Sequence, residues 1–285
     1  MKVLITGGTG GIGYQAAVEF VKKGHQVTIS ARSEEKGRTA VGQIKSSTGI
    51  ECEYVVVDNS DFDSIRRFVE SFKDVVDILI LNAGAMYNTR TDSKYPGVEL
   101  TLVNNHLGHF LLTILLLKKN LIAAKGRIVV VSSSLHGTSV GGGGKPVNFD
   151  WDNLDGQKEY EGMLFYKNSK LANVWFTYAL ARRLKNGITV NALCPGFIPQ
   201  TGLKRDSSFV LGFMMDYIFP YLPFTKPLSH GVEMYLKLAL DPSLDNVNGK
   251  YFSNFEETKS SDMSYDENQQ EKLWRYSCQI TGVEF

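Results

Sequence analysis

Cysteine and long hydrophobic runs are both scarce in this sequence. Only three cysteines occur among 285 residues, at Cys52, Cys194 and Cys278, and they form no CxxC pair. This pattern argues against a disulfide framework or a metal site, and it predicts reduced thiols in a cytoplasmic protein. The longest apolar run, 110–117, is far shorter than the roughly 20 residues that a membrane-spanning helix needs.

Excess charge of one sign and internal repeats are also absent. Lys and Arg number 31 against 30 Asp and Glu, for a net charge of +1, so a nucleic-acid partner is not suggested. The first expected strand begins at residue 2, and we therefore expect no signal or transit peptide. What is present is a chain of 285 residues with 43% hydrophobic side chains. That is enough to bury a sizeable core in one α/β domain spanning 1–285.

Short apolar runs alternate with amphipathic stretches along the chain. The runs expected to be strands cover residues 3–5, 26–31, 53–57, 75–81, 127–132, 188–193 and 250–253. The stretches expected to be helices cover residues 14–23, 34–45, 63–72, 99–123, 163–185, 229–240 and 266–281. Strands separated by helices predict a parallel sheet that is covered on both faces. The expected fold is a single-domain, doubly wound α/β Rossmann fold with a sheet of about seven strands.

Residues 1–13, MKVLITGGTGGIG, form the stretch around which this expected fold is organised. A buried run is followed by a glycine-rich turn that opens the first helix. Glycines let the backbone approach a pyrophosphate closely, and the free N–H groups of a helix N-terminus attract its negative charge. The stretch predicts a dinucleotide-binding turn, although a glycine-rich turn without a ligand has the same pattern.

Ligands of a doubly wound sheet bind beyond the carboxyl ends of its strands. The residues expected at these ends are Thr6, Ala31, Arg32, Asp58, Asn82, Ser133, Pro195 and Gly196. An arginine after the second strand accommodates the 2′-phosphate of NADP, so Arg32 predicts NADPH unless it is only a solvated turn residue. Asp58 either accepts a hydrogen bond from the adenine amine or simply caps the helix that follows.

The expected helix 163–185 carries a tyrosine and a lysine one turn apart. Tyr166 and Lys170 therefore share one helix face. A phenol with a pKa of about 10 is a poor general base at neutral pH, but a nearby ammonium group and a positive nicotinamide ring stabilise the phenolate. Tyr166 would then protonate a nascent alkoxide or remove a hydroxyl proton, while Ser133 donates a hydrogen bond to the reacting oxygen.

In chain order, these motifs resemble those of the short-chain dehydrogenase/reductase family. Thr6-Gly7-x-x-x-Gly11-Ile12-Gly13 is similar to the family's TGxxxGIG motif, and Asn82-Ala83-Gly84 is similar to its NAG motif. Tyr166-x-x-x-Lys170 is similar to its active-site pair, and Pro195-Gly196 is similar to its PG motif. The resemblance covers nearly the whole chain. It implies a nicotinamide-dependent oxidoreductase.

The resemblance also implies a role for each matching residue. The implied catalytic residues are Asn105, Ser133, Tyr166 and Lys170, and in the family this asparagine anchors a water chain to the lysine. Asn105 is preferred over Asn104, and Ser132 and Ser134 remain alternatives to Ser133. The implied NADP(H)-binding residues are Thr6, Gly7, Thr9, Gly11, Ile12, Gly13, Arg32, Asp58, Asn82, Ala83, Gly84, Tyr166, Lys170, Pro195, Gly196, Ile198 and Thr201. Gln200 stands where the family often has the threonine that binds the nicotinamide amide, so either Gln200 or Thr201 serves.

Shorter segments of the sequence resemble two particular branches of the family. Residues 105–110 and 169–173 resemble the retinol dehydrogenase branch, whereas 195–203 and 241–244 resemble the light-dependent protochlorophyllide reductases. Both branches use NADPH. Phe197 replaces the cysteine that usually follows PG in the second branch, so the catalytic half favours alcohol and carbonyl chemistry.

Three histidines lie near these motifs. His106 and His109 are expected to be ordinary helix residues whose polar atoms are satisfied by local hydrogen bonds. His136 lies close to Ser133 in the sequence, which makes it a candidate for lining the substrate pocket.

Residues 197–227 stand where the family builds its substrate lid, and the segment 209–224 is unusually apolar for a surface loop. This segment fits a pocket for an apolar substrate, an ordinary packed helix and loop, or peripheral contact with a membrane or another subunit. We expect NADPH-dependent hydride transfer involving a retinoid, steroid, quinone or lipid aldehyde. The alternatives are reduction of a carbon–carbon double bond in a conjugated substrate and a non-catalytic NADP(H) sensor. The expected assembly is a monomer or a homodimer. The apolar faces 111–117 and 171–178 are candidates for a dimer interface and, equally, for the core.

Overall fold

One twisted sheet runs through the protein, whose computed structural model describes residues 1–137, 145–199 and 225–285. Its strands are β1 (Lys2–Ile5), β2 (Gln26–Ala31), β3 (Glu53–Val56), β4 (Val76–Leu81), β5 (Ile122–Val131), β6 (Thr189–Cys194), β7 (Tyr251–Ser253) and β8 (Glu256–Glu257). Their order is β3-β2-β1-β4-β5-β6-β7-β8. All neighbouring pairs are parallel except β7 and β8. The predicted doubly wound α/β fold is confirmed, and β8 is a short antiparallel addition to it.

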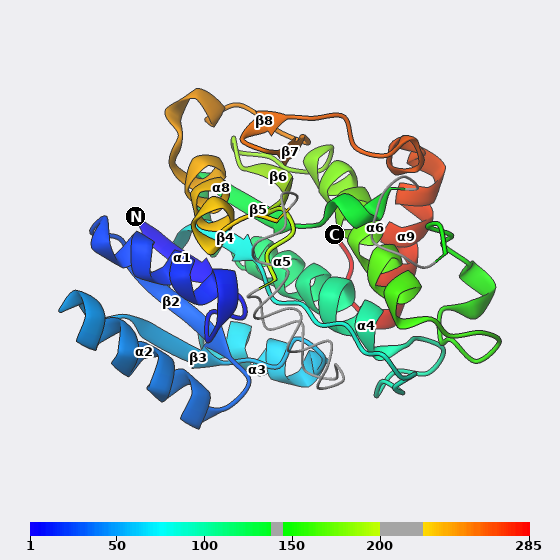
Figure 1. The fold of residues 1–285 in the computed structure, drawn as a ribbon, viewed down its shortest axis with the longest axis horizontal. Helices are drawn as coiled ribbons and strands as arrows, with labels where there is room; N and C mark the ends of the chain where they lie inside the picture. The colour runs from blue at the N-terminus through cyan, green and yellow to red at the C-terminus, as the bar shows by residue number, and fades with distance from the viewer. Residues whose placement is uncertain (138–144, 200–224) are drawn as a thin grey trace.

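Helices cover both faces of this sheet (Figure 1). They are α1 (Gly11–Lys22), α2 (Glu34–Thr48), α3 (Phe62–Ser71), α4 (Leu100–Leu102), α5 (Gly108–Lys118), α6 (Gly162–Ala181), α8 (Leu228–Leu240) and α9 (Glu267–Thr281). Apolar side chains of α1, α2 and α8 pack on one face. Those of α3, α5 and α6 pack on the other, with α9 against α5 and α6.

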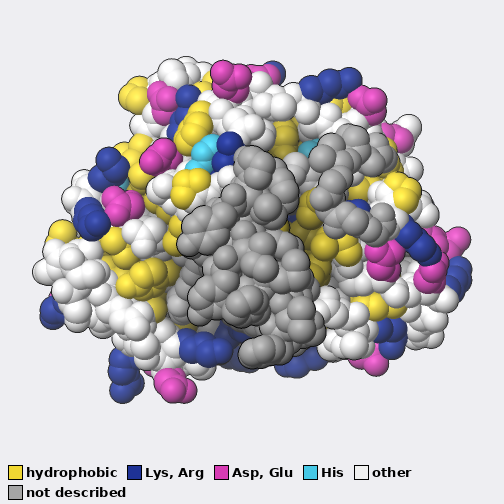
Figure 2. All heavy atoms as spheres, viewed as in Figure 1, with side chains coloured by type: hydrophobic (Ala, Val, Ile, Leu, Met, Phe, Trp, Pro, Cys, Tyr) yellow, Lys and Arg dark blue, Asp and Glu magenta, His cyan; other side chains and the backbone are white. Residues whose placement is uncertain are grey.

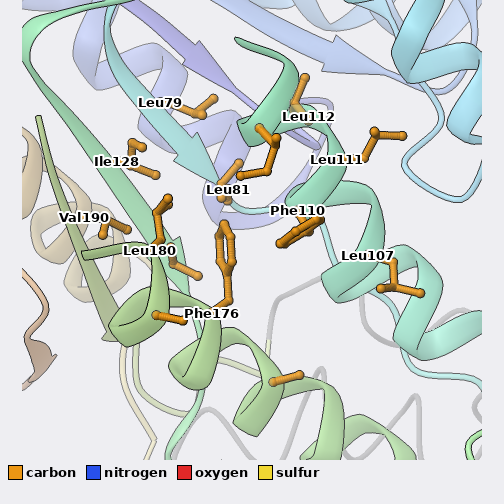
Figure 3. Close-up of a cluster of buried hydrophobic side chains, with 14 of the residues drawn as sticks. Leu79, Leu81, Leu107, Phe110, Leu111, Leu112, Ile128, Phe176, Leu180 and Val190 are labelled. Carbon is orange, nitrogen blue, oxygen red and sulfur yellow. The ribbon is translucent and has the colours of Figure 1, made fainter. Parts of the chain in front are cut away.

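Alternate residues of the central strands serve the two cores. In β4, Leu79 and Leu81 join the core of α5 and α6, whereas Ile78 and Ile80 join the core of α1 and α8. Figure 3 shows the first core, with Phe110 of α5 and Phe176 of α6 pointing toward the leucines of β4. Successive side chains of a strand point to opposite faces of the sheet, and helices cover both faces here. Both faces must therefore be apolar, which explains the continuous hydrophobic runs in the sequence.

The expected helix 99–123 is the largest difference between prediction and structure. Its first part contains a π-helical turn at Val103–Leu107, and α5 ends at Lys118. Asn120 has a left-handed backbone with φ of 54°, which ends the helix because that conformation cannot continue it. β5 then begins at Ile122, which pairs with Val76. The expected strand 127–132 is therefore only the second half of β5.

The apolar stretch of α4 and α5 lies inside the protein. The helical segment Leu100–Lys118 is long and apolar enough to cross a membrane by length and composition, but 83% of its most apolar window is buried in the fold. The faces 111–117 and 171–178, considered above as a dimer interface, are mostly buried within the chain itself. They are core residues of α5 and α6.

Charged side chains of both signs are interspersed over the face drawn in Figure 2. Lys and Arg lie beside Asp and Glu around its rim. This mixture agrees with the nearly equal numbers of basic (31) and acidic (30) side chains in the sequence.

Candidate active site

The glycine turn after β1 is held directly against the Asn82-Ala83-Gly84 turn after β4. The Oγ1 atom of Thr6 accepts hydrogen bonds from the backbone N–H groups of Asn82 (2.9 Å) and Ala83 (3.0 Å). In return, the side-chain amide of Asn82 donates to the carbonyl oxygens of Thr6 (2.8 Å) and Gly7 (3.2 Å). Two predicted cofactor motifs, 76 residues apart in the sequence, therefore form one rigid floor.

The start of α1 fits a dinucleotide phosphate. Among the described residues, no side chain caps the helix at Gly10, and the first turn of the helix carries no acidic residue. Its N–H groups are therefore suited to receive an anion. A Cβ on Gly10 would meet no atom of the described residues within 4 Å, whereas a Cβ on Gly13 would lie 2.4 Å from Nδ2 of Asn82. The turn thus leaves space for a ligand at Gly10, whereas at Gly13 the helix packs tightly against Asn82. Thr9 is half-buried and Ile12 is buried beside this opening.

The end of β2 supports the same turn and presents Arg32. The hydroxyl of Ser30 accepts a hydrogen bond from the N–H of Gly7 (3.0 Å). Arg32, two residues further on, is exposed. The carboxylate of Glu34, the first acid after the strand, accepts a hydrogen bond from the Tyr54 hydroxyl (2.6 Å). The carboxylate of Glu34 is therefore held beside β3, whereas the exposed Arg32 remains near the glycine turn.

Asp58 stabilises its own turn after β3. Its Oδ1 atom accepts hydrogen bonds from the N–H (2.9 Å) and the hydroxyl (2.7 Å) of Ser60. The helix that follows is capped by Asp61 instead. Asp58 therefore forms a turn and is not the helix cap that the sequence offered as an alternative. Its Oδ2 atom stays a candidate for adenine.

Asn105 lies in the π-helical turn and is fully buried. Its Oδ1 atom accepts from the N–H of Ala85 (2.8 Å), and its amide donates to the carbonyl of Ala85 (2.8 Å) and to Oγ of Ser169 (3.0 Å). Asn104 donates to Asn105 (2.9 Å), which makes it a supporting residue. Asn105 thus connects the turn after β4 to helix α6.

Tyr166 and Lys170 meet these elements on α6. Nζ of Lys170 lies 5.5 Å from the ring centroid of Tyr166 and donates to the carbonyl of Val131 (3.1 Å). A Cβ added to Gly84 would lie 3.5 Å from that Nζ and 3.6 Å from Oδ1 of Asn105. Burial raises the pKa of Tyr166 and lowers the pKa of Lys170 to about 8. The structure thus brings Gly84, Asn105, Tyr166 and Lys170 together.

The serines after β5 have different surroundings. The Ser132 hydroxyl is buried and donates to the carbonyl of Lys170 (2.8 Å). Ser134 is exposed. Oγ of Ser133 accepts from the N–H of Leu135 (3.2 Å), and in the part of the chain that the structure describes its O–H has no acceptor. This O–H is therefore available to donate to a substrate oxygen. The geometry therefore favours Ser133 among the three.

His136 holds the serine loop in place. Its Nδ1 lies 2.6 Å from the carbonyl of Ser133, and its Nε2 accepts from the N–H of Ser261 (3.0 Å). The side chain is buried. Because both ring nitrogens are engaged within the fold, His136 is a structural residue rather than a pocket-lining one.

The turn after β6 completes the described part of the site. Gly196 has φ of 88°, a conformation that favours glycine, and its N–H lies against the Cys194 thiol, which also accepts from the N–H of Ser134 (3.2 Å). Ile198 is buried against Gly231 of α8. Gln200, Thr201 and the apolar segment 209–224 lie outside the described residues.

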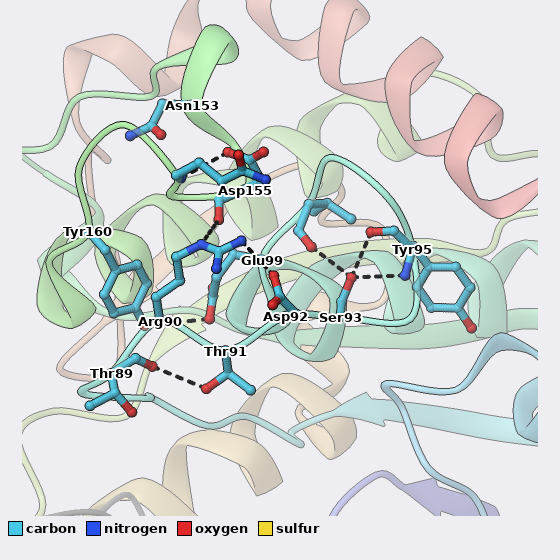
Figure 4. A network of polar contacts seen from close by, with 12 residues as sticks. Thr89, Arg90, Thr91, Asp92, Ser93, Tyr95, Glu99, Asn153, Asp155 and Tyr160 are labelled. Carbon is cyan, nitrogen blue, oxygen red and sulfur yellow. Dashed lines mark hydrogen bonds and ion pairs between the residues drawn. The ribbon is translucent and has the colours of Figure 1, made fainter.

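A polar network anchors the start of α6 to the loop that follows Gly84 (Figure 4). The Tyr160 hydroxyl donates to the carbonyl of Tyr87 (2.6 Å) and lies 3.4 Å from Oε1 of Glu99. Glu99 is buried, which raises the pKa of its carboxyl group. A Cβ on Gly162 would lie 2.2 Å from the Tyr87 carbonyl oxygen. The helix that carries Tyr166 therefore begins in direct contact with this loop.

Several supporting residues were not predicted from the sequence. Ser30 contacts the glycine turn, Ser169 contacts Asn105, and the Tyr235 hydroxyl donates to Oδ1 of Asn82 (2.8 Å). The sequence did contain a signal for these residues. A hydroxyl group in an otherwise apolar strand or helix needs a hydrogen-bond partner once it is buried. Across the described ranges, no group of three or more His, Cys, Asp or Glu side chains is placed to hold a metal ion.

Comparisons with known proteins give consistent results. Residues 1–144 match the family model described as short chain dehydrogenase. The chain is 36% identical over 289 residues to retinol dehydrogenase 12 of Homo sapiens, covering 99% of this chain and 86% of that protein. It is 33% identical over 291 residues to polyprenol dehydrogenase of Homo sapiens, covering 98% and 84%. A crystal structure of an uncharacterized protein from Mycobacterium paratuberculosis superposes with a TM-score of 0.75 at 27% identity, covering 100% and 94%.

Proposed function

Because this chain belongs to the short-chain dehydrogenase family and is an oxidoreductase of alcohols or carbonyl compounds, we propose that it reduces a bulky apolar carbonyl compound with NADPH. Tyr166 is the proposed general acid, assisted by Asn105, Ser133 and Lys170. The observation that carries this proposal is the meeting of Tyr166, Lys170 and Asn105 around Gly84. The bound nicotinamide would supply the hydride.

The protonation states support reduction. Burial raises the pKa of Tyr166, so its hydroxyl is protonated at neutral pH and is able to donate a proton to a nascent alkoxide. The Ser133 hydroxyl would donate a hydrogen bond to the same oxygen as negative charge develops on it. Lys170 would stabilise the phenolate left on Tyr166, since its ammonium group lies against that ring.

The choice of NADPH over NADH is supported at the end of β2. Arg32 is exposed there and offers a planar set of N–H donors to a 2′-phosphate. Glu34 is hydrogen-bonded to Tyr54, which keeps its negative charge on the side of β3. Both features suit a phosphate on the ribose.

The apolar substrate is supported by the relatives and by the composition of 209–224. Retinol dehydrogenase 12 and polyprenol dehydrogenase are named for long apolar alcohols. The segment 209–224 is rich in aromatic and methionine side chains, which suit adaptable apolar pockets. The free thiols of Cys52, Cys194 and Cys278 suit a reducing compartment such as the cytoplasm.

The central experiment compares Tyr166→Phe with Tyr178→Phe. Both tyrosines lie on α6, but the Tyr178 hydroxyl contacts Ser260. Using retinal as the substrate, Tyr166→Phe should lower kcat by at least about 100-fold, while the variant stays folded and still binds NADPH. Tyr178→Phe should retain turnover. Full activity of Tyr166→Phe would contradict the mechanism.

The same assay tests the cofactor and the substrate. Arg32→Ala should raise the KM for NADPH and leave the KM for NADH unchanged. Turnover should favour long apolar aldehydes over small polar ketones. A wild-type preference for NADH, or turnover of small polar ketones only, would contradict the corresponding part of the proposal.

A further inference from the structure

We propose that His109 is a positioning residue that fixes the cofactor floor, formed by the turns after β1 and β4, relative to Asn105 through one hydrogen bond at each of its two ring nitrogens. His109 lies in the first turn of α5 and is fully buried. Its Nε2 atom is 2.8 Å from Oγ1 of Thr6, and its Nδ1 atom is 3.1 Å from the carbonyl oxygen of Asn105. This inference rests on the proposed function, because it concerns the same site.

The positions of the hydrogens follow from what each partner is able to accept. The Asn105 carbonyl only accepts, so Nδ1 of His109 carries a hydrogen and donates it. Oγ1 of Thr6 already accepts from the N–H groups of Asn82 and Ala83, so both of its lone pairs are occupied. The Thr6 hydroxyl therefore donates to Nε2 of His109. A second possible acceptor, the Ile80 carbonyl, is further away at 3.3 Å.

The neutral ring satisfies every partner, and a charged ring would not. A proton on Nε2 would point at a Thr6 oxygen whose lone pairs are already in use. Burial, together with the charge of Lys170, lowers the pKa of His109 to about 3. The ring therefore stays neutral through the physiological range, with one donor and one acceptor in fixed places.

These two hydrogen bonds connect the two halves of the site. Thr6 holds the backbone of Asn82 and Ala83 through its hydroxyl oxygen. Asn105 holds the backbone of Ala85 through its side chain. Gly84, which lies next to Lys170, is between these two anchors. His109 thus sets the distance between the cofactor turn and the π-helical turn that carries Asn105.

His106 provides a matched control on the same helical stretch. It is also fully buried, with its pKa lowered to about 3 by burial. However, its Nε2 atom contacts Oγ of Ser277 on α9 (3.0 Å) and not a residue of the glycine turn. Loss of His106 should reduce stability without changing the geometry of the cofactor floor.

The experiment compares His109→Leu, His109→Asn and His106→Leu. Loss of one or two buried hydrogen bonds should weaken NADPH binding by about 5- to 100-fold in His109→Leu, with a further loss in kcat. His109→Asn keeps a donor near the Asn105 carbonyl and should recover part of kcat while NADPH binding stays weak. His106→Leu should lower the unfolding midpoint, and it should leave NADPH binding much closer to that of wild type than His109→Leu does.

Two further measurements connect the effect to Thr6. In a double-mutant cycle, Thr6→Val with His109→Leu should bind NADPH no more weakly than Thr6→Val alone. Nitrogen-15 NMR of the protein without cofactor should show His109 with its hydrogen on Nδ1 down to pH 5. Equal NADPH affinity and kcat in folded His109→Leu and wild type, or additive effects in the cycle, would overturn the inference. A wild-type protein that binds no NADPH would instead contradict the proposed function.

Discussion

Tyr166 and Lys170 illustrate how burial shapes reactivity at single residues. The sequence favours a tyrosine whose pKa is lowered by its lysine, yet in the protein without cofactor burial raises the pKa of Tyr166. The same burial lowers the pKa of Lys170 to about 8. Lys170 alone does not offset the cost of placing a phenolate in this environment. A neutral Tyr166 is, however, the form that carbonyl reduction requires.

The buried charge of Lys170 predicts an unusual dependence of stability on pH. The pKa of Lys170 falls from 10.5 to about 8 on folding. Between these two values the unfolded chain binds the proton and the folded chain does not, so stability rises with pH in this window. Wild type should therefore gain stability relative to Lys170→Met as the pH increases from 8 to 10.

Chemical denaturation of both proteins across this pH range measures the difference. Subtracting one curve from the other removes the titration of all other groups. A difference in the free energy of unfolding that stays constant from pH 7 to 10 would show that folding does not lower the pKa of Lys170.

At the scale of elements, the contact between α5 and the loop after β3 requires a glycine at position 108, which has no side chain. A Cβ on Gly108 would lie 2.0 Å from the backbone oxygen of Asn59, which has no flexible end that could move aside. Gly108→Ala should therefore destabilise the protein by about 1 to 3 kcal/mol. Because α5 follows directly on Asn105, the same change should also lower kcat.

Gly42 is the control for this prediction. It lies inside α2, where a Cβ would meet nothing within 4 Å. Gly42→Ala should stabilise the protein by about 0.5 to 1 kcal/mol, because alanine loses less backbone freedom than glycine. Urea denaturation of the two variants compares a glycine required by packing with one that is not. Equal effects of both substitutions would contradict the close approach of α5.

The order of strands and helices could be predicted from the sequence because it depends on local apolar patterns. The glycine turn and the Tyr166–Lys170 pair were predictable for the same reason, since their spacing alone places them on known elements. The π-helical turn at Val103–Leu107 could not be predicted, because Asn105 is held by Ala85 and Ser169, far away in the sequence. Similarly, only the pairing of Ile122 with Val76 shows where β5 begins.

At the scale of the whole molecule, the C-terminal segment supports the site from outside the sheet. Ser261 contacts His136, which holds the carbonyl of Ser133. Ser277 of α9 contacts His106, the neighbour of Asn105. These contacts span 125 and 171 residues of sequence. Both the serine loop and the π-helical turn are therefore stabilised by the last part of the chain.

Trp274 of α9 is a buried aromatic residue of this segment, and it carries the last prediction. Its ring packs against Phe110 of α5 at 5.1 Å and Phe176 of α6 at 6.2 Å, with Arg183 4.2 Å away on the ring face. Trp274→Ala should lower the free energy of unfolding by about 3 to 5 kcal/mol. Arg275→Ala, at an exposed neighbouring position, should change it by less than about 0.5 kcal/mol.

Guanidinium denaturation followed by far-ultraviolet circular dichroism measures this effect without relying on tryptophan fluorescence. If α9 folds together with α5 and α6, Trp274→Ala should shift one cooperative transition to lower denaturant. A separate early transition that appears in wild type, or a loss no greater than that of Arg275→Ala, would show that α9 folds independently of them. In that case the contacts to His106 and His136 would not be maintained by the packing of this helix.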